Sequence, residues 1–430
     1  MAGRPGVPLG GGILGVFVAV LALGLVAACG TPGQGVRWQA GPGDVSPTPG
    51  ASQLVITPAA DSKDISPVDP VKVELALGTL DAVTMTNAQG KVVKGDFDAA
   101  KSTWTNSEVL GYNKAYKIVA SGVGADGQRH EQTVSFTTVK PKLLTLPYLR
   151  ANLFTLLDGK TFGVGQPLVV WFDEPIKDKA AAQAALTVTT DPVVEGAWHW
   201  FDNRELHWRP KEYWQPNTKV RIDAMVYGRH FGDGLYGEKD VSASITIGRD
   251  RRLVVDATTQ RMKVYVDGAQ VKSISGKDIT NGIPITTGKA QKEGGVDFRT
   301  YSGVHVMMEK HTVKIMKSCN PDGSGICDPA SPNYYVSEIE KAIRISTSGE
   351  FVHLRDWDLS RLGRVGSGGY PTYGSHGCVN VGAPYIHWIF ENFTSGDIVD
   401  VKNTGKTLNI RDGLGDWIMP WDEWIKGSAL

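Results

Sequence analysis

Ser375-His376-Gly377-Cys378-Val379-Asn380 is the stretch on which the fold and function of this 430-residue chain depend, because it holds one of only four cysteines. The thiolate is the nucleophilic form of cysteine, and a free thiol with a pKa of about 8.5 is mostly un-ionised at pH 7. A nearby histidine can take the proton and hold a thiolate–imidazolium pair. Gly377 lets a carbonyl oxygen come close to the main chain. The hexapeptide favours a catalytic cysteine, with a buried structural cysteine as the alternative.

The N-terminus predicts export. An apolar run from Ile13 to Ala28 follows a positive charge at Arg4 and is shorter than a membrane span of about 20 residues. The small residues before Cys29 resemble a bacterial lipobox, which implies a signal peptide over residues 1–28 and a lipid on the Cys29 thiol. A plain secretory signal or an uncleaved anchor is the alternative. We therefore expect a lipid-anchored protein on the outer face of the cell membrane.

Export to an oxidising compartment would allow the other cysteines to form a disulfide. Cys319 and Cys327 flank a turn-rich loop that is short enough to close with a disulfide. A metal pair is the alternative, but no further ligand stands at a recognisable spacing. Cys378 is then the unpaired thiol, which in an oxidising compartment favours a use for its reactivity.

Composition limits the remaining function classes. Forty-five basic and 45 acidic residues give a net charge of zero, so the sequence has no basic footprint for nucleic acid. No cofactor or metal motif is recognisable, and we expect a monomer. Residues 29–53 are rich in Gly, Pro, Ser and Thr and suit a flexible tether. The long chain that follows predicts more than one domain.

Two β-sandwiches of immunoglobulin type are predicted after the tether, over residues 54–142 and 143–249. Both blocks contain short segments in which apolar and polar residues alternate, as they do in half-buried strands. These segments include Val71–Leu77, Gln132–Thr137 and Ala243–Ile247, and the second block adds the strand-like apolar run Pro167–Phe172. In the second block we expect four tryptophans to form core, and two histidines to be packed or hydrogen-bonded rather than metal-bound: Trp198, Trp200, Trp208, Trp214, His199 and His207.

A third block, over residues 250–402, is also predicted to be mostly β and contains every residue that we assign to chemistry. Its strand-like segments include Leu253–Asp256 and Met262–Val266, the second of which ends in the hairpin turn Asp267-Gly268. The best short helix follows the cysteine motif, at Pro384–Phe393.

This third block resembles the L,D-transpeptidase catalytic domain, a family of cysteine enzymes that cross-link bacterial peptidoglycan. The resemblance is carried by the hexapeptide and by Phe351-Val352-His353, with support from Thr300-Tyr301-Ser302-Gly303. Residues 163–248 resemble the immunoglobulin-like domain of mycobacterial members, and residues 403–430 resemble their C-terminal extension. The resemblance implies a mainly β chain with two immunoglobulin-like domains, a catalytic domain and a short extension.

The resemblance also implies roles for individual residues. Cys378 corresponds to the nucleophile and His353 to the general base, while the amides of His376, Gly377 and Cys378 correspond to the oxyanion hole. The residues expected to line the stem-peptide cleft are Tyr335, Ser348, Gly349 and Asn380. The implied reaction joins two diaminopimelate residues in a 3→3 cross-link through a Cys378 thioester, with release of D-alanine, and carbapenems are expected to acylate the same thiol.

Two departures from the family pattern stand out. Leu354 follows the general base where the family often has serine, although its carbonyl can still accept from the imidazole Nδ1–H. The segment from Arg355 to Tyr373 is longer than usual and is expected over the active site. Three alternatives stay open: an L,D-carboxypeptidase, an amino-acid exchange enzyme, and a wall-binding scaffold lipoprotein with a degenerate third domain.

Overall fold

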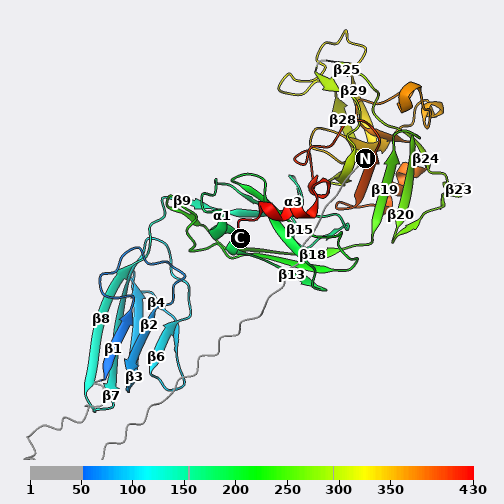
Figure 1. Cartoon of the computed structure of the whole chain (residues 1–430). Helices are drawn as coiled ribbons and strands as arrows, with labels where there is room; N and C mark the ends of the chain where they lie inside the picture. Colours follow the sequence, from blue (N-terminus) through cyan, green and yellow to red (C-terminus); the bar gives the residue numbers. More distant parts are fainter. Residues whose placement is uncertain (1–51, 154, 294) are drawn as a thin grey trace, which may run out of the picture. The chain divides into compact units, whose positions relative to one another are not determined.

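The computed structural model describes residues 52–153, 155–293 and 295–430 (Figure 1). The predicted signal peptide, Cys29 and nearly all of the tether lie outside these residues. In the described part of the chain, no helix is long and apolar enough to cross a membrane. Strands predominate and helices are few and short, so the prediction of a mainly β chain is confirmed.

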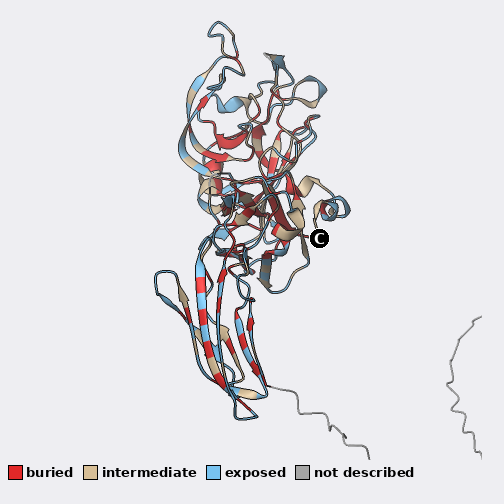
Figure 2. Ribbon diagram, turned by 90° about the vertical axis from the view of Figure 1, so that its left-hand side faces the viewer, coloured by how far each residue is buried: buried red, intermediate tan, exposed pale blue. Residues whose placement is uncertain are grey.

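The first folded block is a sandwich of two four-stranded antiparallel sheets around one core. Its sheets, in strand order, are β1 (Gln53–Thr57), β2 (Lys72–Ala76), β6 (Thr103–Asn106) and β5 (Gly95–Phe97), and β4 (Val92–Val93), β3 (Gly78–Asn87), β7 (Ala115–Gly124) and β8 (Arg129–Thr137). Buried Val73 and Leu75 alternate with exposed Lys72 and Glu74 along β2, and Figure 2 shows this alternation on neighbouring strands. The period-two pattern of the sequence therefore forms one buried face on each strand.

The second block also contains two four-stranded sheets, which are antiparallel except for one parallel edge strand. In strand order they are β10 (Pro147–Arg150), β12 (Leu168–Phe172), β15 (Glu205–Pro210) and β14 (Gly196–Trp200), and β11 (Thr161–Phe162), β18 (Val241–Ile247), β16 (Lys219–Ala224) and β13 (Leu186–Asp191). A short pair, β9 (Leu143–Thr145) with β17 (Leu235–Gly237), and helix α1 (Lys179–Ala184) complete it. The four predicted core tryptophans are all buried here: Trp198, Trp200, Trp208 and Trp214.

The third block is built on a ten-stranded sheet. Its path runs through β27 (Gly303–Val306), β32 (Ile398–Lys402), β19 (Arg251–Asp256), β20 (Arg261–Val266), β24 (Ile283–Thr286), β31 (Val379–Val381), β30 (Phe351–Leu354), β29 (Val336–Arg344) and β28 (Lys310–Lys317), with β21 (Ala269–Gln270) beside β20. Two small pairs lie outside it: β22 (Ser273–Ile274) with β23 (Lys277–Asp278), and β25 (Lys292–Glu293) with β26 (Val296–Asp297). The predicted helix after the cysteine motif is α2 (Tyr385–Asn392), which buries Ile386 and Ile389.

The C-terminal extension packs against the second sandwich. It contains α3 (Trp421–Trp424) and the single turns η3 (Asp416–Ile418) and η4 (Ile425–Gly427). Asp416 Oδ1 lies 2.7 Å from Nδ1 of the buried His207, and the Arg209 guanidinium lies 4.6–5.2 Å from the ring centroids of Trp417, Trp421 and Trp424. These cation–π contacts anchor the tail to β15. His207 is hydrogen-bonded, as predicted, and so is His199, whose Nδ1 lies 2.9 Å from the Trp424 carbonyl.

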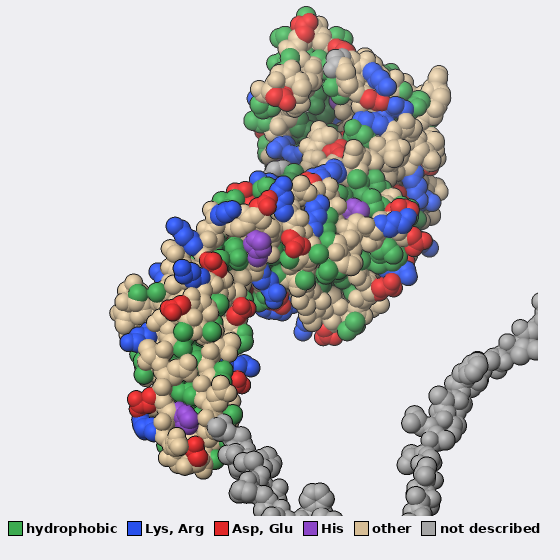
Figure 3. All heavy atoms as spheres, turned by 60° about the vertical axis from the view of Figure 1, so that its left-hand side comes forward, with side chains coloured by type: hydrophobic (Ala, Val, Ile, Leu, Met, Phe, Trp, Pro, Cys, Tyr) green, Lys and Arg blue, Asp and Glu red, His purple; other side chains and the backbone are tan. Residues whose placement is uncertain are grey.

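Charged groups of both signs are interspersed over the molecular face drawn in Figure 3. Neighbouring charges pair locally, as Arg129 does with Asp81 and Glu131 at 3.1 and 2.7 Å. This local pairing matches the zero net charge of the chain.

Candidate active site

Two adjacent parallel strands bring the motifs together. β30 carries His353 and β31 follows directly from Cys378, and their register places His353 opposite Asn380. Residues 27 positions apart in the sequence therefore lie opposite one another. Cys378, His353 and Asn380 line one cavity of about 500 Å³, which we call the nucleophile cavity.

His353 is held as a neutral base. Its Nδ1 lies 2.7 Å from the Leu354 carbonyl oxygen, and since a carbonyl can only accept, Nδ1 carries the hydrogen and Nε2 keeps its lone pair. The side chain is buried, and burial lowers the pKa of His353 to about 4. At pH 7 the imidazole is thus ready to accept a proton, and the expectation that the carbonyl of residue 354 orients it is confirmed.

The Cys378 side chain is half-buried, and its surroundings favour the protonated thiol over the thiolate. Burial raises its pKa to about 12, against a smaller opposing effect of the Phe351 amide, and Sγ lies 3.9 Å from the Gly349 carbonyl oxygen as a weak donor. A low pKa for His353 and a high one for Cys378 both disfavour the thiolate–imidazolium pair that the sequence suggested. The arrangement instead favours proton transfer to His353 as the thiol attacks.

Hydrogen bonds from two hydroxyl groups hold residues 375–378, which we call the nucleophile loop. Ser375 Oγ donates to the Cys378 carbonyl at 2.6 Å and accepts from the Gly377 amide at 3.1 Å, while Thr300 Oγ1 donates to the Gly377 carbonyl at 2.7 Å. Gly377 has φ +127°, a conformation that side chains rarely adopt. Its amide is engaged within the loop, so the oxyanion donors expected here reduce to the amides of His376 and Cys378.

The four residues predicted to line the stem-peptide cleft divide between two cavities. Asn380 lines the nucleophile cavity, and Ser348 and Gly349 line a second cavity of about 570 Å³. Tyr335 lines both, with its ring centroid 5.0 Å from that of His376. Ser348 Oγ donates to Asp412 of the C-terminal extension at 2.6 Å. Gly349 nevertheless reaches the nucleophile, because its carbonyl oxygen lies 3.9 Å from Cys378 Sγ.

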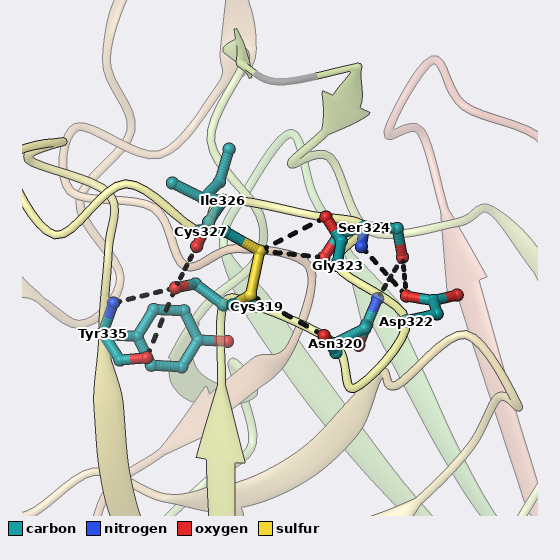
Figure 4. The surroundings of a disulfide bond; sticks show 9 residues. Cys319, Asn320, Asp322, Gly323, Ser324, Ile326, Cys327 and Tyr335 are labelled. Atoms are coloured by element: carbon teal, nitrogen blue, oxygen red, sulfur yellow. Dashed lines mark hydrogen bonds between the residues drawn. A yellow bond between two sulfur atoms is a disulfide. The ribbon is translucent and has the colours of Figure 1, made fainter.

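A disulfide closes the loop between β28 and β29. The Cys319 and Cys327 sulfur atoms are bonded at 1.94 Å, and Figure 4 shows Tyr335 next to this loop. Ser318 Oγ accepts from the Tyr335 amide at 3.0 Å and donates to the Ile326 carbonyl at 2.9 Å. The loop that lines the second cavity is thereby tied to the residue at the junction of both cavities.

The long segment after His353 lies over the nucleophile cavity, as predicted. Arg355, Trp357, Arg361 and Tyr373 all contribute to its lining. The Arg361 guanidinium lies 4.4 Å from the Tyr373 ring centroid, a cation–π contact that joins the middle of the segment to its C-terminal end.

Comparison with known proteins identifies the family. Residues 62–230 match the bacterial Ig domain, and residues 250–401 match the L,D-transpeptidase catalytic domain. L,D-transpeptidase 2 of Mycobacterium tuberculosis is 37% identical over 367 residues, covering 84% of this chain and 81% of that protein. L,D-transpeptidase 5 of the same species is 34% identical, covering 89% and 78%. The chain belongs to the L,D-transpeptidase family.

The resemblance stated from the motifs is thus confirmed, and the chain is an enzyme of this family. A solved L,D-transpeptidase in complex with imipenem shares 22% identity, covers 60% of this chain and 99% of that chain, and superposes with a TM-score of 0.45.

A polar network behind His376 was not foreseen from the sequence. Asn333 Oδ1 accepts from His376 Nε2 at 3.2 Å and from Lys289 Nζ, and Asn333 Nδ2 donates to Glu293. Burial and the nearby Lys289 charge lower the pKa of His376 to about 4, so its ring is neutral at pH 7 and donates through Nε2. The network joins the disulfide loop to the L,D-transpeptidase motif, through residues that no spacing rule connects.

Glu350 is a second residue that the sequence did not reveal. Its side chain is buried, Oε1 accepts from the Tyr301 amide at 3.0 Å, and Oε2 has no partner among the described residues. Oε1 would lie 3.4 Å from a Cβ placed on Gly377, so this carboxyl packs beneath the nucleophile loop. Burial raises the pKa of Glu350 to about 8, with Lys406 opposing the rise. The L,D-transpeptidase site therefore contains a carboxyl that is protonated at pH 7.

Proposed function

We propose that this L,D-transpeptidase forms 3→3 cross-links between diaminopimelate residues of peptidoglycan stem peptides. The observation that carries the proposal is the shared cavity of Cys378 and a His353 whose Nδ1–H is fixed by the Leu354 carbonyl. That tautomer directs the basic Nε2 away from its backbone acceptor. A neutral thiol and a neutral base in one cavity suit acyl transfer through a thioester.

The reaction has two steps. Cys378 Sγ attacks the carbonyl carbon of the third-position diaminopimelate while its proton passes to His353 Nε2. The amides of His376 and Cys378 stabilise the developing oxyanion. The C–N bond to D-alanine then breaks, and His353 returns the proton to the leaving amine. In the second step the side-chain amine of another diaminopimelate attacks the thioester, and the Cys378 thiol is released.

A defined tetrapeptide muropeptide tests this proposal. Intact mass should show an acyl-enzyme on Cys378, and the product should be a dimer that lacks one D-alanine. Cys378→Ala should abolish both, and His353→Ala should slow acylation by about 10²–10⁴-fold. A dimer formed by the Cys378→Ala protein would refute the mechanism. Release of free tripeptide without dimer would indicate an L,D-carboxypeptidase. If intact mass shows no acyl-enzyme and no product forms, the scaffold alternative is favoured.

We also propose that carbapenems acylate Cys378, since a strained acyl donor meets the same thiol and base. Meropenem should add its full mass to the wild type and nothing to Cys378→Ala. The proposed location is the outer face of the cell membrane, with a lipid on Cys29. Mass analysis of the membrane-extracted protein tests this anchor, since an unmodified Cys29 would exclude it.

A further inference from the structure

Arg355 is a buried guanidinium that opens into the nucleophile cavity. It follows the general base by two positions, and its amide donates to the Val381 carbonyl at 2.9 Å, which fixes its backbone beside β31. The residue is 5% exposed, its Nε donates to the Trp357 carbonyl at 3.1 Å, and its guanidinium carbon lies 5.0 Å from the Trp357 ring centroid. One edge of the guanidinium is thus held by the protein.

No carboxylate lies within ion-pair distance of Arg355 among the described residues. The other two cations of the cavity each have a side-chain partner: Arg361 pairs with the Asp358 carboxylate, and Lys289 Nζ donates to the Asn333 amide oxygen. The cavity lining contains three cations and no Asp or Glu. A buried charge is costly when it lacks a partner, so an unpaired arginine here indicates a site whose anion arrives with the ligand.

We propose that Arg355 binds the free carboxylate of the fourth-position D-alanine of the donor stem, and so selects stems that end at that residue. The inference rests on the proposed function. A planar guanidinium with free N–H groups suits two parallel hydrogen bonds to a carboxylate. The D-alanine carboxylate is three covalent bonds from the carbonyl that Cys378 attacks, so any productive pose brings it into the cavity that Arg355 lines.

Two other carboxylates of the stem have the same chemistry, one on diaminopimelate and one on the γ-linked glutamate. Substrates in which each carboxylate is amidated in turn separate these three sources without any change to the protein. Amidation of the D-alanine carboxylate should lower the rate of acyl-enzyme formation about 10- to 100-fold, which is the effect of losing a charge-assisted hydrogen-bond pair. Amidation of either other carboxylate should change it less than about threefold.

Arg355→Gln should remove this discrimination, so that the free and the D-alanine-amidated stems acylate at similar rates. Arg355→Lys should restore part of it, because the charge is kept and the paired donors are lost. Arg364→Gln is the matched control: Arg364 belongs to the same segment but is exposed and does not line the cavity. Its discrimination should equal that of the wild type.

Wild-type acylation by the free tetrapeptide distinguishes a failure of the proposed function from a failure of the role proposed for Arg355. If the wild type forms no acyl-enzyme, the proposed function is wrong. If it does form one and D-alanine amidation has no effect, or Arg355→Gln retains the wild-type discrimination, the inference is overturned. The melting temperature of Arg355→Gln checks that the variant is folded. The amidated substrates test the inference on the wild type even if the variant does not fold.

Discussion

Glu350→Gln is the substitution that best tests the electrostatics of the site. Glu350 has a pKa of about 8 when folded, against a usual value of 4.5, because its side chain is buried beneath Gly377. Between about pH 4.5 and pH 8 the folded chain therefore keeps a proton on Glu350 that the unfolded chain has lost. At 1.36 kcal/mol for each tenfold step in acidity, the difference corresponds to on the order of 5 kcal/mol.

The sign of this effect follows from the raised pKa. The contribution of Glu350 is fully present below pH 4.5 and is lost as the pH rises through about 8. Gln has nearly the same shape and no charge, so Glu350→Gln removes the pH dependence and retains the amide contact with Tyr301. The stability of the wild type relative to Glu350→Gln should therefore fall steadily between pH 5 and pH 8.5.

Chemical denaturation at half-unit pH steps measures this difference in stability, because the contributions of groups shared by both proteins cancel.

Glu309→Gln serves as the control of opposite sign. Burial raises the pKa of Glu309, but its pairing with His311 and with Arg344, whose Nε lies 2.9 Å from Oε1, lowers that pKa overall. Its contribution is lost as the pH falls. Parallel wild-type and Glu350→Gln curves across the whole range would show that Glu350 is ionised in the folded protein and would refute the reasoning.

Two further predictions follow from the other buried groups. Acylation should hold nearly constant from pH 7 to 5 and fall about tenfold per unit below pH 4, as His353 with its pKa of about 4 becomes protonated; a midpoint near 6.5 in the pH–rate profile would contradict this. The His207 pKa, which burial lowers but Asp416 and Glu205 raise to about 9, should give stability on the order of 3 kcal/mol that is present below pH 6.5 and lost through pH 9. Asp416→Asn should remove it in thermal melts at pH 6 and leave little difference at pH 10, whereas equal losses at both would indicate a purely steric role.

Much of the fold could be predicted because its signals are local. Period-two alternation marked β2, β8 and β18, an apolar run marked β12, and the Asp267-Gly268 dipeptide marked the turn after β20, where both residues have positive φ. The meeting of Cys378 and His353 in one cavity was also predictable, since the cysteine motif and Phe351-Val352-His353 are each contiguous. The mainly β class and the family followed from these segments alone.

The remaining parts of the site depend on pairings that a single sequence does not encode. Glu350 precedes β30, an interior strand of the sheet whose four residues are all buried. In the sequence it is an ordinary acidic residue at the start of a strand. Asn333 meets His376 from a loop 43 positions away. Ser375 appeared only as part of a motif, yet its hydroxyl engages the Gly377 amide and so removes one expected oxyanion donor.

Leu354 shows why a departure from the family pattern can leave the chemistry intact. The group that orients His353 is the carbonyl of residue 354, at 2.7 Å from Nδ1, and every amino acid has that carbonyl. The side chain itself is buried in the core of the catalytic domain, where leucine is favoured over a hydroxyl that would need a partner. Selection on this position can therefore act on packing while the backbone holds the tautomer. Leu354→Ser should consequently lower stability, by about 2–4 kcal/mol for a lost buried leucine, and change the rate of acylation by less than tenfold; a large loss of activity with unchanged stability would assign the role to the side chain instead.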